Sequence, residues 1–204
     1  MLNDIAYYTG FFPDFVLAGI TTRKFGDFSK AASINKLASV LKIKTSGIVS
    51  LKQKHTNIVH AIDSVPVLGV LTGDGLMTKT KNVLILVKTA DCLPVLVADI
   101  KKKIIMALHA GRLGVENMFL KEALIKLIKS GTNVKNVKIH IGPHIEGSCY
   151  LTDMDKSILK QLHTFGILPN QVYLKNECTR CNQDKYFSHR GGDSGRMATF
   201  IMIQ

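Results

Sequence analysis

Three short apolar segments lie close together in the middle of the chain and constrain its fold more than any other feature. Residues 83–87, 95–98 and 104–108 are rich in β-branched side chains and too short for helices, so they predict three buried strands. The connection between the first two carries a polar pair, Asp91 and Cys92, followed by Pro94. Polar side chains at such an interruption predict a site at a strand end, where the backbone turns toward a cleft.

The rest of the chain adds helices and further strands. Helical spacing of apolar residues predicts helices over residues 28–41, with Ser29 as N-cap, 115–128 and 153–163. Short apolar runs predict strands at residues 15–20, 48–52, 58–62, 67–71, 137–141, 171–174 and 197–203. Because strands and helices do not alternate regularly, the pattern predicts an α+β fold with mixed sheets. A length of 204 residues predicts a single domain over residues 1–204.

The composition favours a soluble protein of a reducing compartment. No apolar run approaches the roughly 18 residues that a membrane span needs, and the first residues lack the basic start and apolar stretch of a secretory signal. Four cysteines in such a chain favour free thiols. We therefore expect a cytoplasmic protein with no membrane association.

The net charge of +12 invites a nucleic-acid interpretation, but the distribution of the charge argues against one. The lysines are scattered, and residues 101–103, the one run of three, fall in an expected hairpin turn. No zinc-finger spacing, RNA-binding aromatic motif or basic helix is present. The five arginines each lie in a Gly-, Cys- or His-bearing stretch, and their planar fork favours a small anionic ligand; they are Arg23, Arg112, Arg180, Arg190 and Arg196.

Three side chains at the ends of apolar runs are candidates for one metal ion: His55, Cys92 and His109. A catalytic zinc site has three protein ligands and one position open to water or substrate, and two imidazoles with one thiolate satisfy that count. Ala110 and Gly111 would allow a close approach to the backbone. The alternative is structural: a lone cysteine in a core is usually a small buried hydrophobe, and a lone histidine is usually hydrogen-bonded.

The other cysteines suggest no second site. Cys178 and Cys181 form a C-x-x-C pair, but a zinc ribbon needs a second pair with similar spacing. Cys149 stands alone in the sequence. We expect Cys178 and Cys181 to be structural.

Several blocks of the chain together resemble the laccase-domain family, also labelled polyphenol oxidase and more recently interpreted as zinc-dependent purine nucleoside phosphorylases. The blocks run through most of the chain in the family's order. They are Thr21-Thr22-Arg23, Gln53-Lys54-His55, Asp74-Gly75-Leu76 with Thr78, Thr89 to Pro94, His109-Ala110-Gly111 with Gly114, Ile141-Gly142-Pro143, Cys178-Thr179, Phe187-Ser188, Arg190, and Gly195-Arg196.

The resemblance implies an α+β domain of mixed β-sheets packed together and flanked by helices. It implies that His55, Cys92 and His109 hold Zn²⁺ beside the substrate. The implied reaction is phosphorolysis of adenosine, inosine or guanosine to the free base and ribose 1-phosphate. Cleavage of methylthioadenosine and deamination of adenosine are also ascribed to the family. The expected partners are thus a purine nucleoside and phosphate, with no nucleic acid. The sequence leaves the oligomeric state open between a monomer and a homodimer.

Further residues receive roles within this scheme. Arg23 is the expected phosphate ligand, whereas Arg190 and Arg196 are expected to anchor loops. Asp91, beside the ligand Cys92, would orient a ligand or move a proton; the alternative is simple hydrogen bonding at the strand end. The family usually follows His-Ala-Gly with Trp-Arg-Gly, whereas this chain has Arg112-Leu113-Gly114 and no tryptophan.

Three rival functions stay open. A copper-dependent, laccase-like polyphenol oxidase gathers four coppers with many histidines, but this chain has seven histidines and no His-x-His pair; copper could still occupy the single site as an adventitious or alternative metal. A hydrolase would use Cys92 as nucleophile and His109 as base. A family member without catalytic activity is the third.

Overall fold

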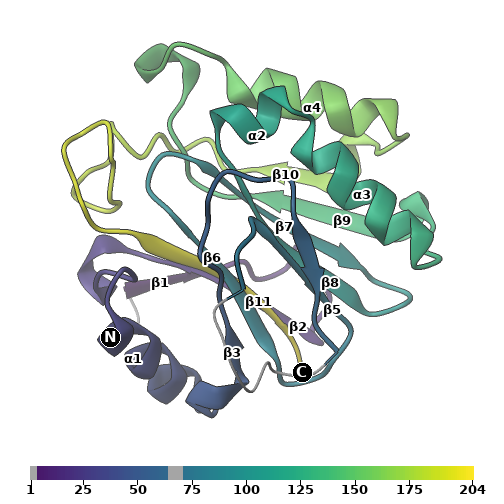
Figure 1. The fold of residues 1–204 in the computed structure, drawn as a ribbon, viewed down its shortest axis with the longest axis horizontal. Helices are drawn as coiled ribbons and strands as arrows, with labels where there is room; N and C mark the ends of the chain where they lie inside the picture. Colours follow the sequence, from purple (N-terminus) through teal and green to yellow (C-terminus); the bar gives the residue numbers. More distant parts are fainter. Residues whose placement is uncertain (1–3, 64–70) are drawn as a thin grey trace.

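The structure, a computed structural model, describes residues 4–63 and 71–204 as two mixed β-sheets packed face to face with helices on both outer sides (Figure 1). The α+β class and the helix-flanked sheets predicted above are confirmed. The strand predicted at residues 67–71 falls, apart from Leu71, outside the described residues. Within the described part of the chain, no helix is long and apolar enough to cross a membrane.

The first sheet has five strands, antiparallel except for one parallel edge pair, β3 with β6. Its order is β1 (Ile5–Tyr7), β2 (Val16–Thr21), β11 (Met197–Ile203), β6 (Leu84–Thr89) and β3 (Ile48–Val49).

The second sheet has six strands, with a parallel pair at each edge and antiparallel strands between. Its order is β10 (Val172–Leu174), β9 (Val137–Ile141), β7 (Leu93–Asp99), β8 (Ile104–Ala110), β5 (Gly75–Thr78) and β4 (Val59–Ala61). Two connections therefore cross between the sheets on the way to the candidate site. The chain passes from β6 to β7 through Cys92 and from β3 to β4 through His55.

Burial on both faces explains the continuous apolar runs of the central strands. Ile85 of β6 and Ile105 of β8 lie in the core between the sheets. The alternate residues face outward: Leu86 packs with the cluster beneath α1, and Met106 with the cluster beneath the other helices. Because all four side chains are fully buried, neither face of these strands needs polar residues.

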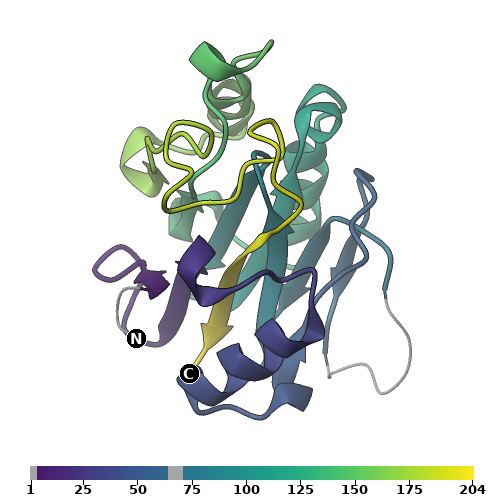
Figure 2. The same ribbon diagram turned by 90° about the vertical axis from the view of Figure 1, so that its left-hand side faces the viewer.

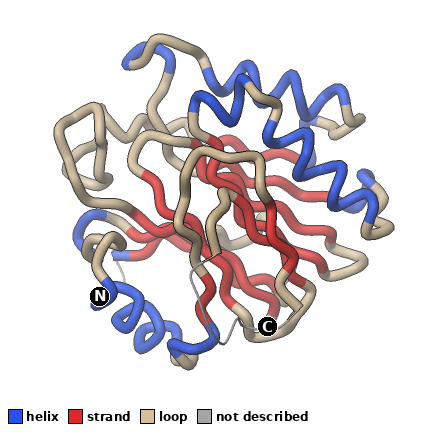
Figure 3. Tube along the Cα trace, viewed as in Figure 1, coloured by secondary structure: helices blue, strands red, loops and turns tan. Residues whose placement is uncertain are grey.

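The helices cover the outer faces (Figures 1 and 3). Helix α1 (Ala31–Leu41) covers the first sheet, and α2 (Arg112–Glu116), α3 (Phe119–Lys129) and α4 (Met154–Thr164) cover the second. In Figure 2, the yellow-green loop between β10 and β11 lies over one end of the sheets.

Two predictions about the helices are wrong. The single helix expected over residues 115–128 is two helices, because Met118 has a left-handed backbone (φ 58°) that ends one and begins the other. The N-cap of α1 is Lys30, not Ser29. The Ser29 hydroxyl instead donates to the carboxylate of Asp27, since a serine two residues after an aspartate can close a local turn.

Candidate metal centre

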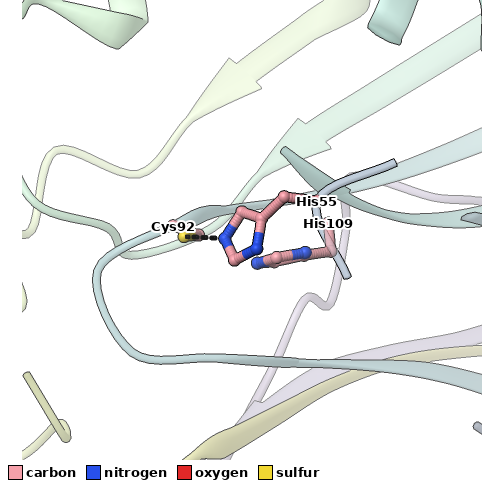
Figure 4. A group of neighbouring side chains, drawn as sticks. All are labelled: His55, Cys92 and His109. Atoms are coloured by element: carbon pink, nitrogen blue, oxygen red, sulfur yellow. Dashed lines mark hydrogen bonds between the residues drawn. The ribbon is translucent and has the colours of Figure 1, made fainter. Parts of the chain in front are cut away.

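His55, Cys92 and His109 come together in the structure (Figure 4). One possible ligand atom from each residue lies within 4.8 Å of those of the other two. Cys92 Sγ is 3.8 Å from His55 Nε2, and the centres of the two imidazole rings are 4.9 Å apart. The register of β7 against β8, which pairs Pro94 with His109, brings Cys92 beside His109. The convergence predicted from the sequence thus exists in the fold.

A buried carboxylate, Asp74, fixes His109. Its Oδ1 atom lies 2.7 Å from Nδ1 of His109, and the Asp74 side chain is fully buried. With Nδ1 bound in this way, Nε2 is the nitrogen left to face the cluster. A carboxylate behind a histidine in this arrangement sets the tautomer and orientation of a metal ligand.

The same carboxylate fixes the loop that carries His55. Oδ2 of Asp74 accepts hydrogen bonds from the backbone N–H of Lys54 (3.3 Å) and Thr56 (2.6 Å) and from the Thr56 hydroxyl (2.8 Å). Between these residues His55 has a left-handed backbone, with φ 56°, a conformation that costs a non-glycine residue about 1 kcal/mol or more. The hydrogen bonds on both sides hold it there.

Gly111 is required by the close approach of the ligands. A Cβ atom at this position would lie 2.5 Å from Cδ2 of His55 and 3.1 Å from Sγ of Cys92. The first distance is well inside van der Waals contact, and both neighbours are candidate ligands, so a larger residue would displace them. The close approach at Gly111 agrees with the role predicted for the small residues after His109.

The charges within the cluster favour a thiolate. Burial raises the pKa of Cys92, but hydrogen bonds to His109 and His55 outweigh it and bring the pKa to about 6. Burial lowers the pKa of His109, but its bonds to Asp74 and Cys92 raise it to about 9. Burial also opposes ionisation of Asp74, yet its hydrogen bonds to His109 and Thr56 lower its pKa to about 2. Cys92 is therefore largely deprotonated at neutral pH.

This donor set fits zinc. Two imidazoles and one thiolate are among the ligand combinations of catalytic zinc sites, which leave a fourth position open. A hydrolase built on Cys92 and His109 would use only one imidazole as base. It would leave His55, 3.8 Å from the sulfur, without a function.

Asp91 lies next to the centre but binds elsewhere. Its Oδ1 accepts from the hydroxyl of Thr179 and its Oδ2 from the backbone N–H of Arg190, both at 2.7 Å. Asp91 thus ties the loop between β10 and β11 to the turn that carries Cys92. Asp74, not Asp91, makes the ligand-orienting bond to His109. In the sequence, Asp74 stood out only as part of a family motif.

Arg23 lies among structural partners. Its Nη2 donates to Oδ2 of Asp193 (2.5 Å) and to the carbonyl of Tyr186 (3.1 Å). Its guanidinium stacks 4.6 Å from the centre of the Phe187 ring. Arg23 lines neither of the two cavities that adjoin the centre.

Those two cavities differ in chemistry. Both are lined by His55, Cys92 and His189. The first, of about 250 Å³, has an apolar wall that includes Leu113, Ile145, Tyr150 and Met154, with the charged residues Asp91, Arg112 and Arg190 also present. The second, of about 420 Å³, is lined by three cations, Lys52, Lys88 and Arg196. The carboxylate of Asp27 lies nearby, where it accepts the backbone N–H of Arg196 and attracts the ammonium group of Lys88.

Comparison with known proteins assigns the family. A family model described as multi-copper polyphenol oxidoreductase laccase matches residues 26–155 and 150–204. The chain belongs to this family.

Two relatives are purine nucleoside phosphorylases. One, of Clostridium acetobutylicum, is 32% identical over 199 residues, which are 83% of this chain and 82% of the relative. The other, of Mycobacterium tuberculosis, is 32% identical over 207 residues, 88% of this chain and 82% of the relative.

A crystal structure of another protein shows the same fold. The hypothetical protein YfiH of Bacillus licheniformis superposes with a TM-score of 0.90, covering 99% of this chain and 97% of that one at 22% identity. At this identity the similarity establishes the shared fold.

Proposed function

We propose that this protein is a zinc-dependent purine nucleoside phosphorylase. The observation that carries the proposal is the position of the three candidate ligands between an apolar and a cationic cavity. The names of the two relatives support the same reaction. The substrates proposed are adenosine, inosine, guanosine and methylthioadenosine, each with phosphate.

His55, Cys92 and His109 would hold the zinc ion, with Asp74 behind His109. Zinc would supply Lewis-acid polarisation of an oxygen at its open position. The surrounding residues would exclude water on the apolar side and orient the reactants.

The purine suits the first cavity. A flat heteroaromatic base would lie against the ring of Tyr150 and the aliphatic side chains of Leu113 and Ile145. Arg112, which replaces the family's usual tryptophan, is at this cavity and pairs with Glu116 at 2.9 Å. A cation paired with Glu116 in place of a flat aromatic ring would alter which bases bind.

Phosphate suits the second cavity, where Arg196, Lys88 and Lys52 supply positive charge. This assignment replaces Arg23, whose guanidinium is bound to Asp193. In the reaction a phosphate oxygen forms a bond to C1′ of the ribose as the bond from C1′ to the base breaks. The base leaves with the electron pair and takes up a proton. Asp91 acts as a positioning residue that holds the wall of the first cavity.

Adenosine deamination is a second proposal for the same centre. Zinc held by His55, Cys92 and His109 would supply an activated water for the hydrolytic replacement of the 6-amino group of adenine, with ammonia as the other product. The first cavity supports this proposal, because its lining includes both Cys92 and His55 together with the apolar side chains that suit the base.

The test uses purified full-length protein with each nucleoside, with and without phosphate, and chromatographic separation of nucleoside, base and ribose 1-phosphate. Phosphate-dependent release of base supports phosphorolysis, and inosine formed from adenosine without phosphate supports deamination. Cys92→Ala should lose both activity and the zinc of this centre while keeping its circular dichroism spectrum. Oxygen uptake with a phenol after copper loading, and no turnover of nucleosides, would instead favour the polyphenol oxidase.

A further inference from the structure

A second cluster of sulfur ligands lies outside the candidate centre. Cys149 ends a short 3₁₀ turn (Gly147–Cys149), and Cys178 and Cys181 lie in the loop between β10 and β11. Their three sulfur atoms are within 4.8 Å of one another. In the sequence Cys149 stands alone and the C-x-x-C pair lacks further ligands; the fold supplies the third thiol from a distant segment.

We propose that Cys149, Cys178 and Cys181 bind a second metal ion, a thiophilic cation of the zinc class, with a fourth position open at the surface. Thiolates that share a tetrahedral zinc ion at about 2.3 Å lie about 3.8 Å apart. Cys149 Sγ and Cys181 Sγ are 3.3 Å apart, far beyond the roughly 2.05 Å of a disulfide bond. A small rotation of the exposed Cys181 side chain is enough to separate the three sulfur atoms to the distances that an ion between them requires.

The backbone around Cys178 prepares a thiolate. Its sulfur is buried, and it accepts hydrogen bonds from the backbone N–H groups of Glu146 and Cys181. An N–H that points at sulfur from the second cysteine of a C-x-x-C turn stabilises the charged, metal-binding form. The turn is rigid, because Asn182 donates both its backbone and side-chain N–H to the carbonyl of Cys178 (3.1 and 2.8 Å).

The charge nearby also suits an anionic trithiolate complex. Three thiolates and one divalent cation carry a net negative charge. The guanidinium of Arg180, the residue between the two cysteines of the C-x-x-C pair, reaches the Cys149 carbonyl at 3.5 Å. This places a cation beside the cluster on its exposed side.

An ion here would brace the wall of the apolar cavity. Cys149 precedes Tyr150, which lines that cavity. Cys178 precedes Thr179, which donates to Asp91 next to Cys92. Linking the two segments through one ion fixes Tyr150 relative to the first centre without contact between the metal and the substrate.

The test removes the first centre. The full-length double variant His55→Ala/Cys92→Ala keeps all three cysteines of the second cluster. After reduction, loading with Zn²⁺ and gel filtration, it should retain about one equivalent of zinc, and Co²⁺ should give an intense thiolate charge-transfer band. Iodoacetamide should label Cys149 and Cys181, the two thiols of the cluster that are not buried, only after a chelator is added. No nucleoside is used, so the result does not depend on the proposed phosphorylase activity.

The matched variant adds Cys181→Ser, an exposed position whose replacement should leave the circular dichroism spectrum unchanged. It should lose the retained zinc and the charge-transfer band. The proposal is overturned if the double variant retains no metal, if the metal and the band persist after Cys181→Ser, or if mass spectrometry of the freshly reduced, zinc-loaded protein finds a Cys149–Cys181 disulfide.

Discussion

Asp74 Oδ1 lies 2.7 Å from His109 Nδ1, while the other oxygen of the same carboxylate accepts two hydrogen bonds from Thr56. One buried side chain thus orients one candidate ligand directly and another through the loop that carries it. The geometry of the centre depends on this carboxylate as much as on the ligands themselves.

Asp74→Asn should weaken zinc binding by about 10- to 100-fold, the usual effect of losing the partner of a ligand histidine. The amide keeps the shape, but its NH₂ group faces the N–H donor of Thr56 or the ring N–H of His109. Competition with a chromophoric chelator measures the affinity. Asp99→Asn is the matched control. Asp99 is also fully buried, and its Oδ1 accepts backbone N–H groups in the hairpin at Lys101 and Lys102. An unchanged zinc affinity in Asp74→Asn would contradict the assigned role.

Gly111→Ala should reduce zinc occupancy and activity together, because the new methyl group would displace the His55 ring 2.5 Å away. Metal content and turnover report the effect. Gly114→Ala, in helix α2, is the control, since its nearest neighbour would be 3.6 Å away. It should keep its metal and gain up to about 1 kcal/mol of helix stability. Full zinc occupancy in Gly111→Ala would show that the ligands bind the ion without a close approach of the backbone at this position.

Arg196→Gln should raise the KM for phosphate by about tenfold or more, equivalent to about 1.4 kcal/mol, with a smaller effect on the KM for nucleoside. Arg23→Gln should lower stability, because it loses the contacts to Asp193 and Phe187, but should leave the KM for phosphate unchanged. Steady-state kinetics with phosphate as the varied substrate separates the two. If Arg23→Gln raises the KM for phosphate and Arg196→Gln does not, Arg23 is the phosphate ligand, as expected from the sequence.

His140 should make stability fall as the pH drops. It is buried between Tyr8 and Tyr173, and burial, with a contribution from Lys175, lowers its pKa to about 3. Below about pH 6.5 the unfolded chain takes up a proton at this residue that the folded protein does not. The free energy of unfolding should therefore fall with pH, by about 2 kcal/mol from this group between pH 7.5 and 5.

His140→Phe, which keeps an aromatic ring in the stack, should lack this dependence. Urea unfolding at several pH values gives the free energy of unfolding of each protein. In the difference between the two free energies, the contributions of the other titrating groups cancel. The exposed His163→Gln serves as control and should follow the wild type. A constant difference between the wild type and His140→Phe across this range would contradict the prediction, because it would show that His140 takes up its proton at the same pH in the folded and the unfolded protein.

Local pattern was sufficient for much of this structure. The three central strands are buried on both faces, so their sequences are uniformly apolar, and the polar residues that interrupt or end them mark the centre. What the pattern missed depends on partners distant in the chain. Asp74 acquires its role only when β5 pairs with β8, and Cys149 meets Cys181 only in the folded protein. Arg23 appeared free to bind an anion because its partner, Asp193, lies far along the sequence.

The two connections that carry His55 and Cys92 each pass from one sheet to the other. Cys92 and His55 thus stand where the chain has just left the first sheet, while the β7–β8 register and Asp74 hold both beside His109 in the second sheet. An ion held by all three would tie the two crossings to each other, so that neither crossing could move without the other. Removing such an ion should loosen this rim of the sandwich before the rest of the fold.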